Sequence, residues 1–521
     1  MKKYVLALAI IIYSTSLMAQ TEFDAAKLLQ TDISGTARYM GMAGSLSAAG
    51  GDASAIKDNP AGMGLYRNSE LMVTGNMQLQ KSNANWYSGT GFFSQSNIGL
   101  NSFSFVLVPS SLKKQSRDKK DKKRKRESLF TQSFSLSYNK LANFNRKLFI
   151  GSNVNATQTS ISDYIAYNTG NIIGTDLGSS NTYQNDNTPW ISALANKAGL
   201  ITEIAGTTES TWVSALGNAE KITPTYYASE KGSLNELSVG WAGSYKNFVH
   251  LGITANIQTL NYSCIGKYSE TFEQGGTMDL RDSINTKGTG INFKLGAIVC
   301  PNENFNVGVS VQSPTVYALK DNSNGQIIST RNAANLLSTT PLATIDYKLQ
   351  KMVQFGISGA YTYGDKGLVS CGVDYALNSR TRLKSQSGDA LYYMTENQAI
   401  KDNLKNILRF KIGGEYNINE NVTLRAGLAY TTRSTDQNAT EILKQNTKRI
   451  DTQYFIGSGN MYESVGAGYH TNKWSVDIAL TNKNLSETFY PYNDNNLANK
   501  NTAGTVKTSI NNIVISFGYK L

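Results

Sequence analysis

Charged side chains recur from residue 236 to residue 477 at positions that alternate with apolar residues. The nine charged or titratable residues at such positions are Glu236, His250, Lys294, Asp374, Arg409, Lys411, Glu415, Arg425 and Asp477. Four are cations, Lys294, Arg409, Lys411 and Arg425, and a cluster of cations can hold an acidic headgroup through charge-assisted hydrogen bonds. Alternatively, these groups pair with the charges of an N-terminal segment, which are Arg38, Asp52, Lys57 and Asp58. The sequence therefore predicts either a headgroup site or internal ion pairs.

Patterns typical of catalysis and metal binding are sparse. The chain has two histidines, His250 and His470, and three widely spaced cysteines, Cys264, Cys300 and Cys371, without a C-x-x-C. It also lacks H-E-x-x-H and G-x-S-x-G. An odd number of scattered cysteines does not make a disulfide framework. We therefore expect no catalytic residue, no metal site and no cofactor. Ligation of haem iron by His250 is a weaker interpretation than packing in the interior.

Two amphipathic stretches lie in residues 140–233, the longest segment without strand periodicity. The first follows Thr188 and Pro189, a typical helix start. The apolar residues of the two stretches are Trp190, Ile191 and Leu194 in the first and Trp212, Val213 and Leu216 in the second. An apolar groove between them could capture a lipid tail. Two helices that pack on each other are the alternative, and the sequence leaves both open.

The elements that must position all these residues are strands. In the last segment Ile513, Ile515 and Phe517 share one face while Val514 and Ser516 share the other, and this alternation recurs from about residue 70. A soluble β-sandwich alternates too. Long strands, short turns that alternate with long loops, and aromatic residues near the short turns favour a transmembrane barrel. The predicted fold is all-β: a 14-stranded antiparallel transmembrane barrel.

The strand count is even, which puts both ends of a barrel on the periplasmic side. The predicted strands are 69–78, 97–108, 129–139, 234–245, 247–260, 288–299, 304–317, 346–361, 367–378, 406–417, 421–432, 461–470, 472–481 and 508–521. The predicted outer segments are 140–233, 261–287, 318–345, 379–405, 433–460 and 482–507. The even strand count holds only if residues 146–158 belong to the first outer loop, and it puts the turn 109–128 on the periplasmic side.

Composition excludes other classes. Of the 521 residues 17% are charged, below the roughly 25% typical of soluble proteins. No run after residue 19 approaches the roughly 20 apolar residues of a transmembrane helix. The net charge is +12, but residues 113–126 hold ten basic and two acidic residues and so supply +8 of it. Because the basic charge is confined to this run, we expect no nucleic-acid partner. Contact of the run with lipid or sugar phosphates stays an alternative.

The N-terminus is typical of an exported protein. Lys2 and Lys3 precede an apolar stretch at residues 4–13, and cleavage after Ala19 would leave Gln20 first. Residues 20–65 do not alternate and are rich in small residues, which allow close packing inside a narrow lumen. We predict a signal peptide at 1–19, a hatch that plugs the lumen at 20–65, and the barrel at 66–521.

The junction of hatch and barrel carries a specific pattern. Asp52-Ala53-Ser54-Ala55 and Asn59-Pro60-Ala61-Gly62 stand directly before the first strand, and residues 288–297 and 313–317 add mid-barrel segments. Here the chain resembles the FadL-type long-chain fatty-acid transporters, the OmpP1/FadL/TodX family. The resemblance extends over most of the chain after the signal peptide. It implies that Asn59, Pro60, Ala61 and Gly62 fix the place where the hatch meets the barrel.

The resemblance also implies a function. Family members catch hydrophobic compounds, such as long-chain fatty acids or aromatic hydrocarbons, with their outer loops. The compounds pass the hatch and leave passively through the wall at a kink in the third strand. The third strand here, residues 130–139, contains neither Gly nor Pro. The sequence therefore does not identify the exit route.

Other roles and partners follow from the same resemblance. A related branch binds exported proteins in type IX secretion, and haem uptake and an open porin are further alternatives. The expected location is the outer membrane of a Gram-negative-type envelope. The expected partners are outer-membrane lipid, a hydrophobic ligand and, through the C-terminal strand, the barrel-assembly machinery. We expect a monomer.

Overall fold

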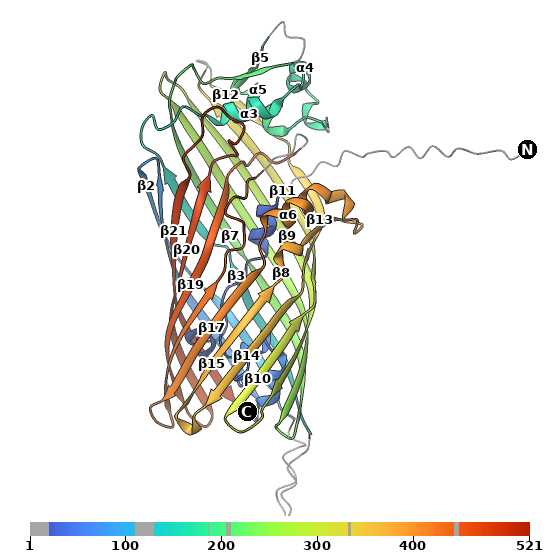
Figure 1. Ribbon diagram of the computed structural model, residues 1–521, viewed down its shortest axis with the longest axis vertical. Coiled ribbons are helices and arrows are strands. Elements are labelled where there is room, and N and C mark those ends of the chain that lie inside the picture. The colour runs from blue at the N-terminus through green and yellow to red at the C-terminus, as the bar shows by residue number, and fades with distance from the viewer. Residues whose placement is uncertain (1–19, 110–129, 186, 205–209, 332–334, 442–446) are drawn as a thin grey trace, which may run out of the picture.

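The chain forms a closed antiparallel barrel (Figure 1). The computed structural model describes residues 20–109, 130–185, 187–204, 210–331, 335–441 and 447–521. One sheet of 19 strands closes on itself because β21 pairs with β1. The wall has 14 positions, since four positions consist of two consecutive segments each and β12 only extends a hairpin. The predicted fold class is confirmed.

The wall strands run in chain order around the barrel. The first six positions are β1 (Glu70–Trp86), β2 (Gly89–Leu107), β3 (Phe130–Asn143) with β4 (Arg146–Gly151), β7 (Ile222–Tyr245), β8 (Val249–Phe272) and β9 (Thr277–Val299). Three interrupted positions follow, which are β10 (Phe305–Gln312) with β11 (Thr315–Ser329), β13 (Ala343–Lys351) with β14 (Gln354–Thr362), and β15 (Gly367–Ala376) with β16 (Arg382–Ser385). The last five are β17 (Ile407–Asn417), β18 (Val422–Thr431), β19 (Tyr454–His470), β20 (Trp474–Tyr490) and β21 (Gly504–Lys520), and β12 (Leu336–Thr339) pairs with β11.

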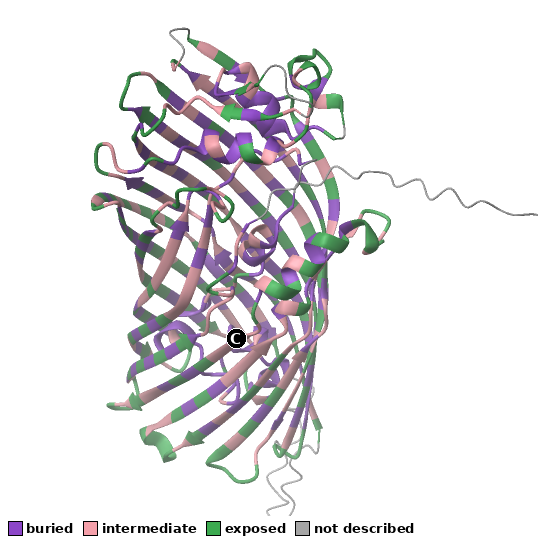
Figure 2. Ribbon diagram, turned by 45° about the horizontal axis from the view of Figure 1, so that its top comes forward, coloured by how far each residue is buried: buried purple, intermediate pink, exposed green. Residues whose placement is uncertain are grey.

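Each strand turns an apolar face outward. On β8, Leu251, Ile253 and Ile257 are exposed, whereas the alternating residues Gly252, Thr254 and Asn256 are buried in the lumen. Figure 2 shows this alternation of exposed and buried residues along the wall. Exposed aromatic residues gather near the short turns, including Tyr245, Phe305, Tyr361, Tyr416, Tyr469, Trp474 and Tyr519. Lipid stabilises an exposed apolar belt with such an aromatic girdle.

The predicted strands are all present, but several extend farther toward the long loops. β7 and β8 contain 24 residues each. The prediction that residues 261–287 form a loop is therefore wrong, because β8 and β9 continue to a turn at 273–276. Beyond the apolar belt the outward residues are mostly polar, whereas inward residues such as Tyr268 and Leu280 are buried in a core, so the apolar face changes sides although backbone pairing continues. Residues 146–151 form β4, which continues β3 on the long-loop side and so keeps the predicted parity.

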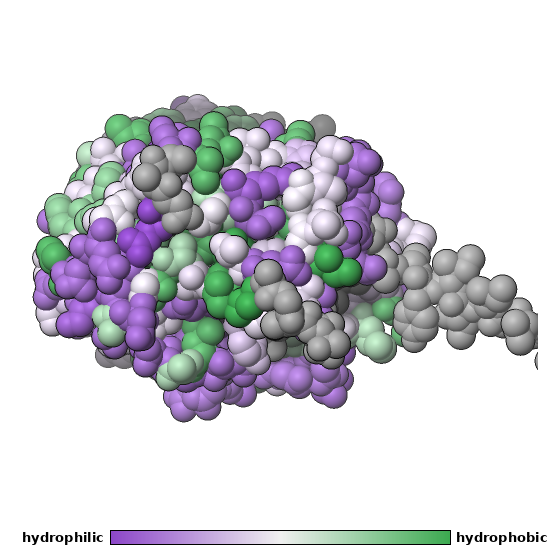
Figure 3. Space-filling view, turned by 90° about the horizontal axis from the view of Figure 1, so that it is seen from above, coloured by the Kyte–Doolittle hydropathy of each residue, from purple (hydrophilic) through white to green (hydrophobic). Residues whose placement is uncertain are grey.

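Most of the helices belong to two regions that are not part of the wall, the hatch and the outer cap (Figure 1). The hatch, inside the lumen, contains α1 (Glu22–Leu28), α2 (Ala37–Gly41), η1 (Ala55–Lys57) and η2 (Pro60–Leu65). The outer cap, on the long-loop rim, contains α3 (Ile161–Thr169), α4 (Gly174–Gly178), η5 (Thr182–Gln184), α5 (Trp190–Lys197), β5 (Ile201–Glu203) and β6 (Trp212–Ser214). Hydrophilic residues predominate on the surface of this end in Figure 3. No helix of the described residues is long and apolar enough to span a membrane.

Two predicted features lie outside the described residues. These are the signal peptide at 1–19 and all but the first residue of the basic turn at 109–128. β2 ends and β3 begins at the end of the barrel that carries the short turns, where β3 pairs with β7 beside the turn at 246–248.

Candidate functional site

The junction residues 59–62 lie against the inner face of β8, β9 and β10. The Asn59 side-chain amide donates to the carbonyl oxygens of Ala297 and Val309, both at 3.3 Å. The Asn59 Oδ1 atom accepts a hydrogen bond from the Ala61 backbone N–H at 3.1 Å, which caps η2. One asparagine thus fixes the start of η2 and ties it to two strands. This arrangement is compatible with the role that the family resemblance implies.

Close packing at the junction depends on glycines in the wall. A Cβ atom on Gly252 would lie 2.3 Å from the Pro60 carbonyl carbon, and one on Gly296 would lie 2.0 Å from Asn59 Oδ1. Because a larger residue would overlap the hatch, only glycine permits this approach. His250 lies beside them, fully buried against the hatch, and does not line the cavity described below.

Arg425, one of the four predicted headgroup cations, belongs to an ion-pair network. Its Nη1 atom lies 2.5 Å from Asp477 Oδ1 and its Nε atom 3.0 Å from Glu415 Oε2. The Glu415 carboxylate also accepts from Arg38 of the hatch at 2.8 Å. The network ties α2 to β17, β18 and β20. Since each charge has an opposite neighbour, it matches the pairing alternative.

Lys411 and Lys294 contact the hatch as well. Lys411 Nζ lies 2.9 Å from Asp374 Oδ2 and 3.2 Å from Asp58 Oδ2. Lys294 Nζ donates to the Lys57 carbonyl oxygen. Burial acts to raise the pKa of Asp58, but the ammonium groups of Lys411 and Lys57 outweigh it and hold this pKa well below its usual range. These cations hold the hatch in place, and their donors already contact protein groups.

A cavity of about 210 Å³ lies between α1 and the wall. Its apolar and aromatic lining residues include Phe23, Leu28, Leu29, Tyr226, Ile284, Ile407, Tyr454, Phe455 and Leu485. Charged residues line it too, and most are paired: Arg449 contacts Asp24 at 2.9 Å, and Arg146 contacts Glu230 at 2.8 Å. The lining thus combines apolar and aromatic side chains with many polar and charged groups. A lining of this kind suits a ligand that has both an apolar part and a charged part.

Three of the cations that line this cavity, Lys351, Arg409 and Arg433, have no carboxylate within 4.0 Å among the described residues. Lys351 is 7% exposed, and among the described residues no carboxylate lies within 4.0 Å of its Nζ atom. Arg409 donates to neutral acceptors, which are the Thr31 carbonyl oxygen at 2.6 Å and Thr431 Oγ1 at 3.2 Å. Burying a cation without a counter-charge costs free energy. Lys351 and Arg409 therefore offer an anionic group a favourable place in the lumen.

The sequence pointed to Arg409 but not to Lys351. In the predicted strand 346–361, Lys351 shares the parity of Phe355 and Ile357, which face lipid. The strand is interrupted between β13 and β14, and the parity changes at the interruption. Lys351 therefore faces the lumen. The polar residues Lys348 and Gln350 on the other face were a signal for this change, because lipid-facing positions should be apolar.

Strand pairing in the wall is interrupted between the second and third positions, and we call this interruption the opening. Pairing of β2 with β3 ends at Ser102 and Asn139. Immediately beyond, the pairing of β3 with β7 shifts register between Lys140 and Ala142. A bulge of this kind bends a strand and ends its pairing on one side without Gly or Pro. A second cavity, of about 40 Å³, lies at this opening, and Asn101 lines it.

An ion pair stands between the two cavities. Lys483 lines both of them, and its Nζ atom lies 2.7 Å from Asp32 Oδ1 of the hatch. The other carboxylate oxygen of Asp32 accepts from the backbone N–H of Asn143 on β3 at 3.3 Å. Burial acts to raise the pKa of Asp32, but the Lys483 ammonium outweighs it, so the pKa lies below its usual value. The hatch is thus tied to the wall beside the opening.

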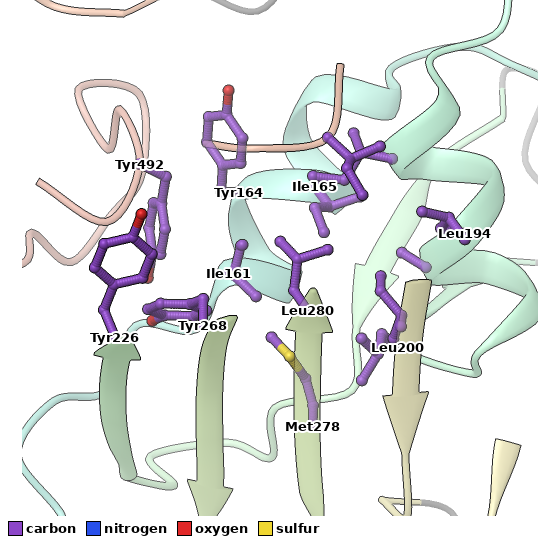
Figure 4. Packing of buried hydrophobic residues seen from close by; sticks show 14 of the residues in the cluster. Ile161, Tyr164, Ile165, Leu194, Leu200, Tyr226, Tyr268, Met278, Leu280 and Tyr492 are labelled. Atoms are coloured by element: carbon purple, nitrogen blue, oxygen red, sulfur yellow. The ribbon is translucent and has the colours of Figure 1, made fainter. Parts of the chain in front are cut away.

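The predicted outer-loop residues form a core instead of an open groove (Figure 4). Trp190, Ile191, Leu194 and Trp212 are buried, and Leu216 packs against them half-buried. The Trp212 indole N–H donates to a backbone carbonyl oxygen in the same cap at 2.9 Å. The predicted second amphipathic helix is wrong, because residues 212–214 form β6; α3, which the sequence did not indicate, packs beside α5 instead. The buried core thus favours packing over an open groove, with α3 in the place of the predicted second helix.

A closed barrel with a lipid-facing apolar belt, an internal hatch and a cavity beside it defines a transport protein of the outer membrane. The family described as "Outer membrane protein transport protein (OMPP1/FadL/TodX)" matches residues 15–521. The chain belongs to this family, whose members are transport channels.

Two solved structures are similar to the chain. A FadL homologue from Pseudomonas aeruginosa is 13% identical, with a TM-score of 0.53, over 94% of this chain and 99% of that one. The Pseudomonas putida toluene transporter TodX is 10% identical, with a TM-score of 0.46, over 94% of this chain and 99% of that one. No curated protein sequence matches the chain. At such low identity the homologue shows the shared fold alone.

Proposed function

We propose that the protein is a passive channel for hydrophobic compounds with an acidic end group, of which long-chain fatty acids are the simplest. The observation that carries this proposal is the pair Lys351 and Arg409, which line the cavity beside α1 and have no carboxylate within 4.0 Å among the described residues. A fatty-acid carboxylate supplies the missing charge, while its alkyl chain contacts the apolar lining. A purely aromatic hydrocarbon would leave both cations unpaired.

The proposed route leads from the cavity to the opening in the wall. The ligand passes the Asp32–Lys483 pair and leaves between β2 and β3, beside the exposed side chains of Ile98 and Leu100. Both residues belong to the lipid-facing side of β2, so a hydrophobic ligand moves from the lumen into lipid without crossing water. No energy source is needed, because the ligand moves down its own gradient.

The test is uptake of radiolabelled palmitic acid by cells that make the wild type, Lys351→Gln or Arg409→Gln. Below saturation we expect each variant to take up palmitic acid about tenfold more slowly, since each loses a charge-assisted hydrogen bond. Lys405→Gln is the control, because Lys405 pairs with Asp436 on the outer surface. Equal uptake by wild type, both variants and control would contradict the proposal.

A further inference from the structure

One segment leaves the wall just where the apolar belt ends. Residues 378–405, which we call the overhang, contain η7 (Asn378–Arg380), β16, η8 (Leu391–Tyr393) and α6 (Met394–Asn403). In Figure 1 and Figure 2, α6 projects from the outside of the wall. β13 and β14 form the wall position next to β15 and β16. The outward residues of β14 include Phe355 and Ile357, whereas those of β13 are polar. Since the belt ends between β14 and β13, the overhang lies at the level of lipid headgroups.

Cations gather on the outer surface at this level. The outward-facing cations are Lys287 on β9, Lys320 on β11, Lys348 on β13, and Arg382 and Lys384 on β16. They form a continuous patch, because Lys287 is the register partner of Lys320, and Lys348 is the register partner of Lys384. One carboxylate, Asp346, lies 3.6 Å from Lys320 Nζ. Among the described residues, no carboxylate lies within 4.0 Å of Lys348 or Lys384.

Directly opposed like charges destabilise a sheet. Two opposed lysines that form no ion pair within 4.0 Å among the described residues therefore weaken the pairing of β13 with β16 unless an anion lies between them. β16 is short and, of the wall strands, pairs with β13 alone among the described residues. An anion at this position would stabilise an otherwise weak hairpin.

The tip of the overhang is apolar and faces away from the barrel. Leu391 is 77% exposed and Met394 67%, and Tyr392 beside them is also exposed. The opposite side of η8 and α6 is buried. Ile400 of α6 packs in the core around α1, and the Tyr393 hydroxyl donates to Gln20 Oε1 at 3.1 Å. The tip is thus held rigidly in an exposed position, which leaves its apolar surface without cover from this chain.

We propose that the overhang and the adjoining strands bind an anionic lipid of the outer leaflet. Lys348 and Lys384 hold the phosphate of its headgroup, Arg382 lies beside them, and Leu391 and Met394 enter the apolar layer next to it. This occupant neutralises the opposed lysines and also removes the tip from water. A free phosphate ion would do only the first, and a soluble protein would not account for the position at the edge of the belt.

The first test measures lipid binding to the full chain in phosphatidylcholine nanodiscs with added phosphatidylglycerol. We expect Lys348→Gln/Lys384→Gln to weaken binding of phosphatidylglycerol by about tenfold or more. The matched control, Lys81→Gln/Lys507→Gln, removes two exposed lysines from β1 and β21 and should bind like the wild type. Equal binding by the double variant, or displacement of phosphatidylglycerol by millimolar inorganic phosphate, would overturn the proposal.

The second test measures the depth of the tip and does not depend on the lysines. A nitroxide is attached to Leu391→Cys in a background in which Cys264, Cys300 and Cys371 are changed to serine. In vesicles we expect this label to be accessible to oxygen and protected from a water-soluble nickel complex. The same label on Ile173→Cys, an exposed residue of the outer cap, should show the opposite pattern. A label at residue 391 that behaves like the label at 173 would show a tip in water, as a soluble protein partner requires, and would overturn the lipid proposal.

Discussion

Cations in the lumen have different partners at two levels, the hatch and the cavity above it. At the hatch, Arg425 and Lys411 each contact two carboxylates. At the cavity above, Lys351 and Arg409 form no ion pair within 4.0 Å among the described residues, and Arg409 donates to neutral acceptors. Removing one member of a buried pair leaves the other charge uncompensated, whereas removing an unpaired buried charge relieves a cost. The comparison therefore separates cations that hold the structure together from the two cations that we propose bind the ligand.

The largest effect is expected at the paired level. Arg425→Ala leaves Asp477 and Glu415 with fewer partners inside the lumen, so we expect the free energy of unfolding to fall by about 3–5 kcal/mol. Lys405→Ala, which breaks an exposed pair with Asp436, should cost about 1 kcal/mol or less. Urea unfolding in detergent measures both. A similar loss in the two variants would remove the distinction between inner and outer pairs.

The opposite sign is expected at the cavity. Lys351→Met keeps the length of the side chain but removes an unpaired buried charge, so we expect the protein to become more stable by about 1 kcal/mol. The same urea experiment compares this variant with Lys411→Met, which should be destabilised. A stability loss in Lys351→Met as large as that in Lys411→Met would show that Lys351 has a structural role like Lys411.

A smaller effect is expected at the ion pair between the cavities. Asp32→Asn removes the charge that holds Lys483, so we expect faster release of palmitic acid from the cavity, by about three- to tenfold. Because the pKa of Asp32 is lowered in the folded protein, Asp32 stays ionised above the ordinary aspartate pKa of about 4, and its ion pair with Lys483 is intact there. The pair is lost only as the pH falls through the lowered pKa. Stopped-flow release should thus be independent of pH in the wild type from about pH 5 to 8. Release by Asp32→Asn at the wild-type rate would mean that this pair is no barrier.

The smallest effect on the ligand is expected in the outer cap. Trp212→Phe removes the hydrogen bond of the indole N–H and should cost about 1 kcal/mol of stability. Affinity for palmitic acid should not change, since Trp212 is buried in a packed core instead of a groove. A clear loss of affinity in a fully folded variant would restore the groove interpretation.

The sequence predicted the wall well because lipid imposes a strict rule on it. Outward positions such as Ile253 and Phe293 must be apolar, so their alternation with polar residues marks each strand and the face to which Lys294 and Arg425 belong. It could not identify the partner of each charge, because the contact of Arg38 with Glu415 joins residues that are far apart in the chain. It also missed Lys351, since an interruption of two residues changes the parity.

The opening in the wall shows a second limit of the sequence. The family resemblance predicts a kink at Gly or Pro in the third strand, but this strand has a bulge next to Leu141 instead. A bulge adds one residue to one strand, and a register cannot be read from a single strand without its partner. In the same way, the buried state of Trp190 depends on contacts with distant loops and not on its own amphipathic stretch.

The most direct measurement is the equilibrium binding of palmitic acid and of the alcohol of equal chain length to the purified, folded protein and to Lys351→Gln. We expect the wild type to prefer the acid, and the variant to lose about tenfold in affinity for the acid with little change for the alcohol, because only the acid contacts the cation. Equal affinities of the wild type for acid and alcohol, or an equal loss of both ligands in the variant, would contradict the claim that the unpaired cations of the cavity receive an acidic end group.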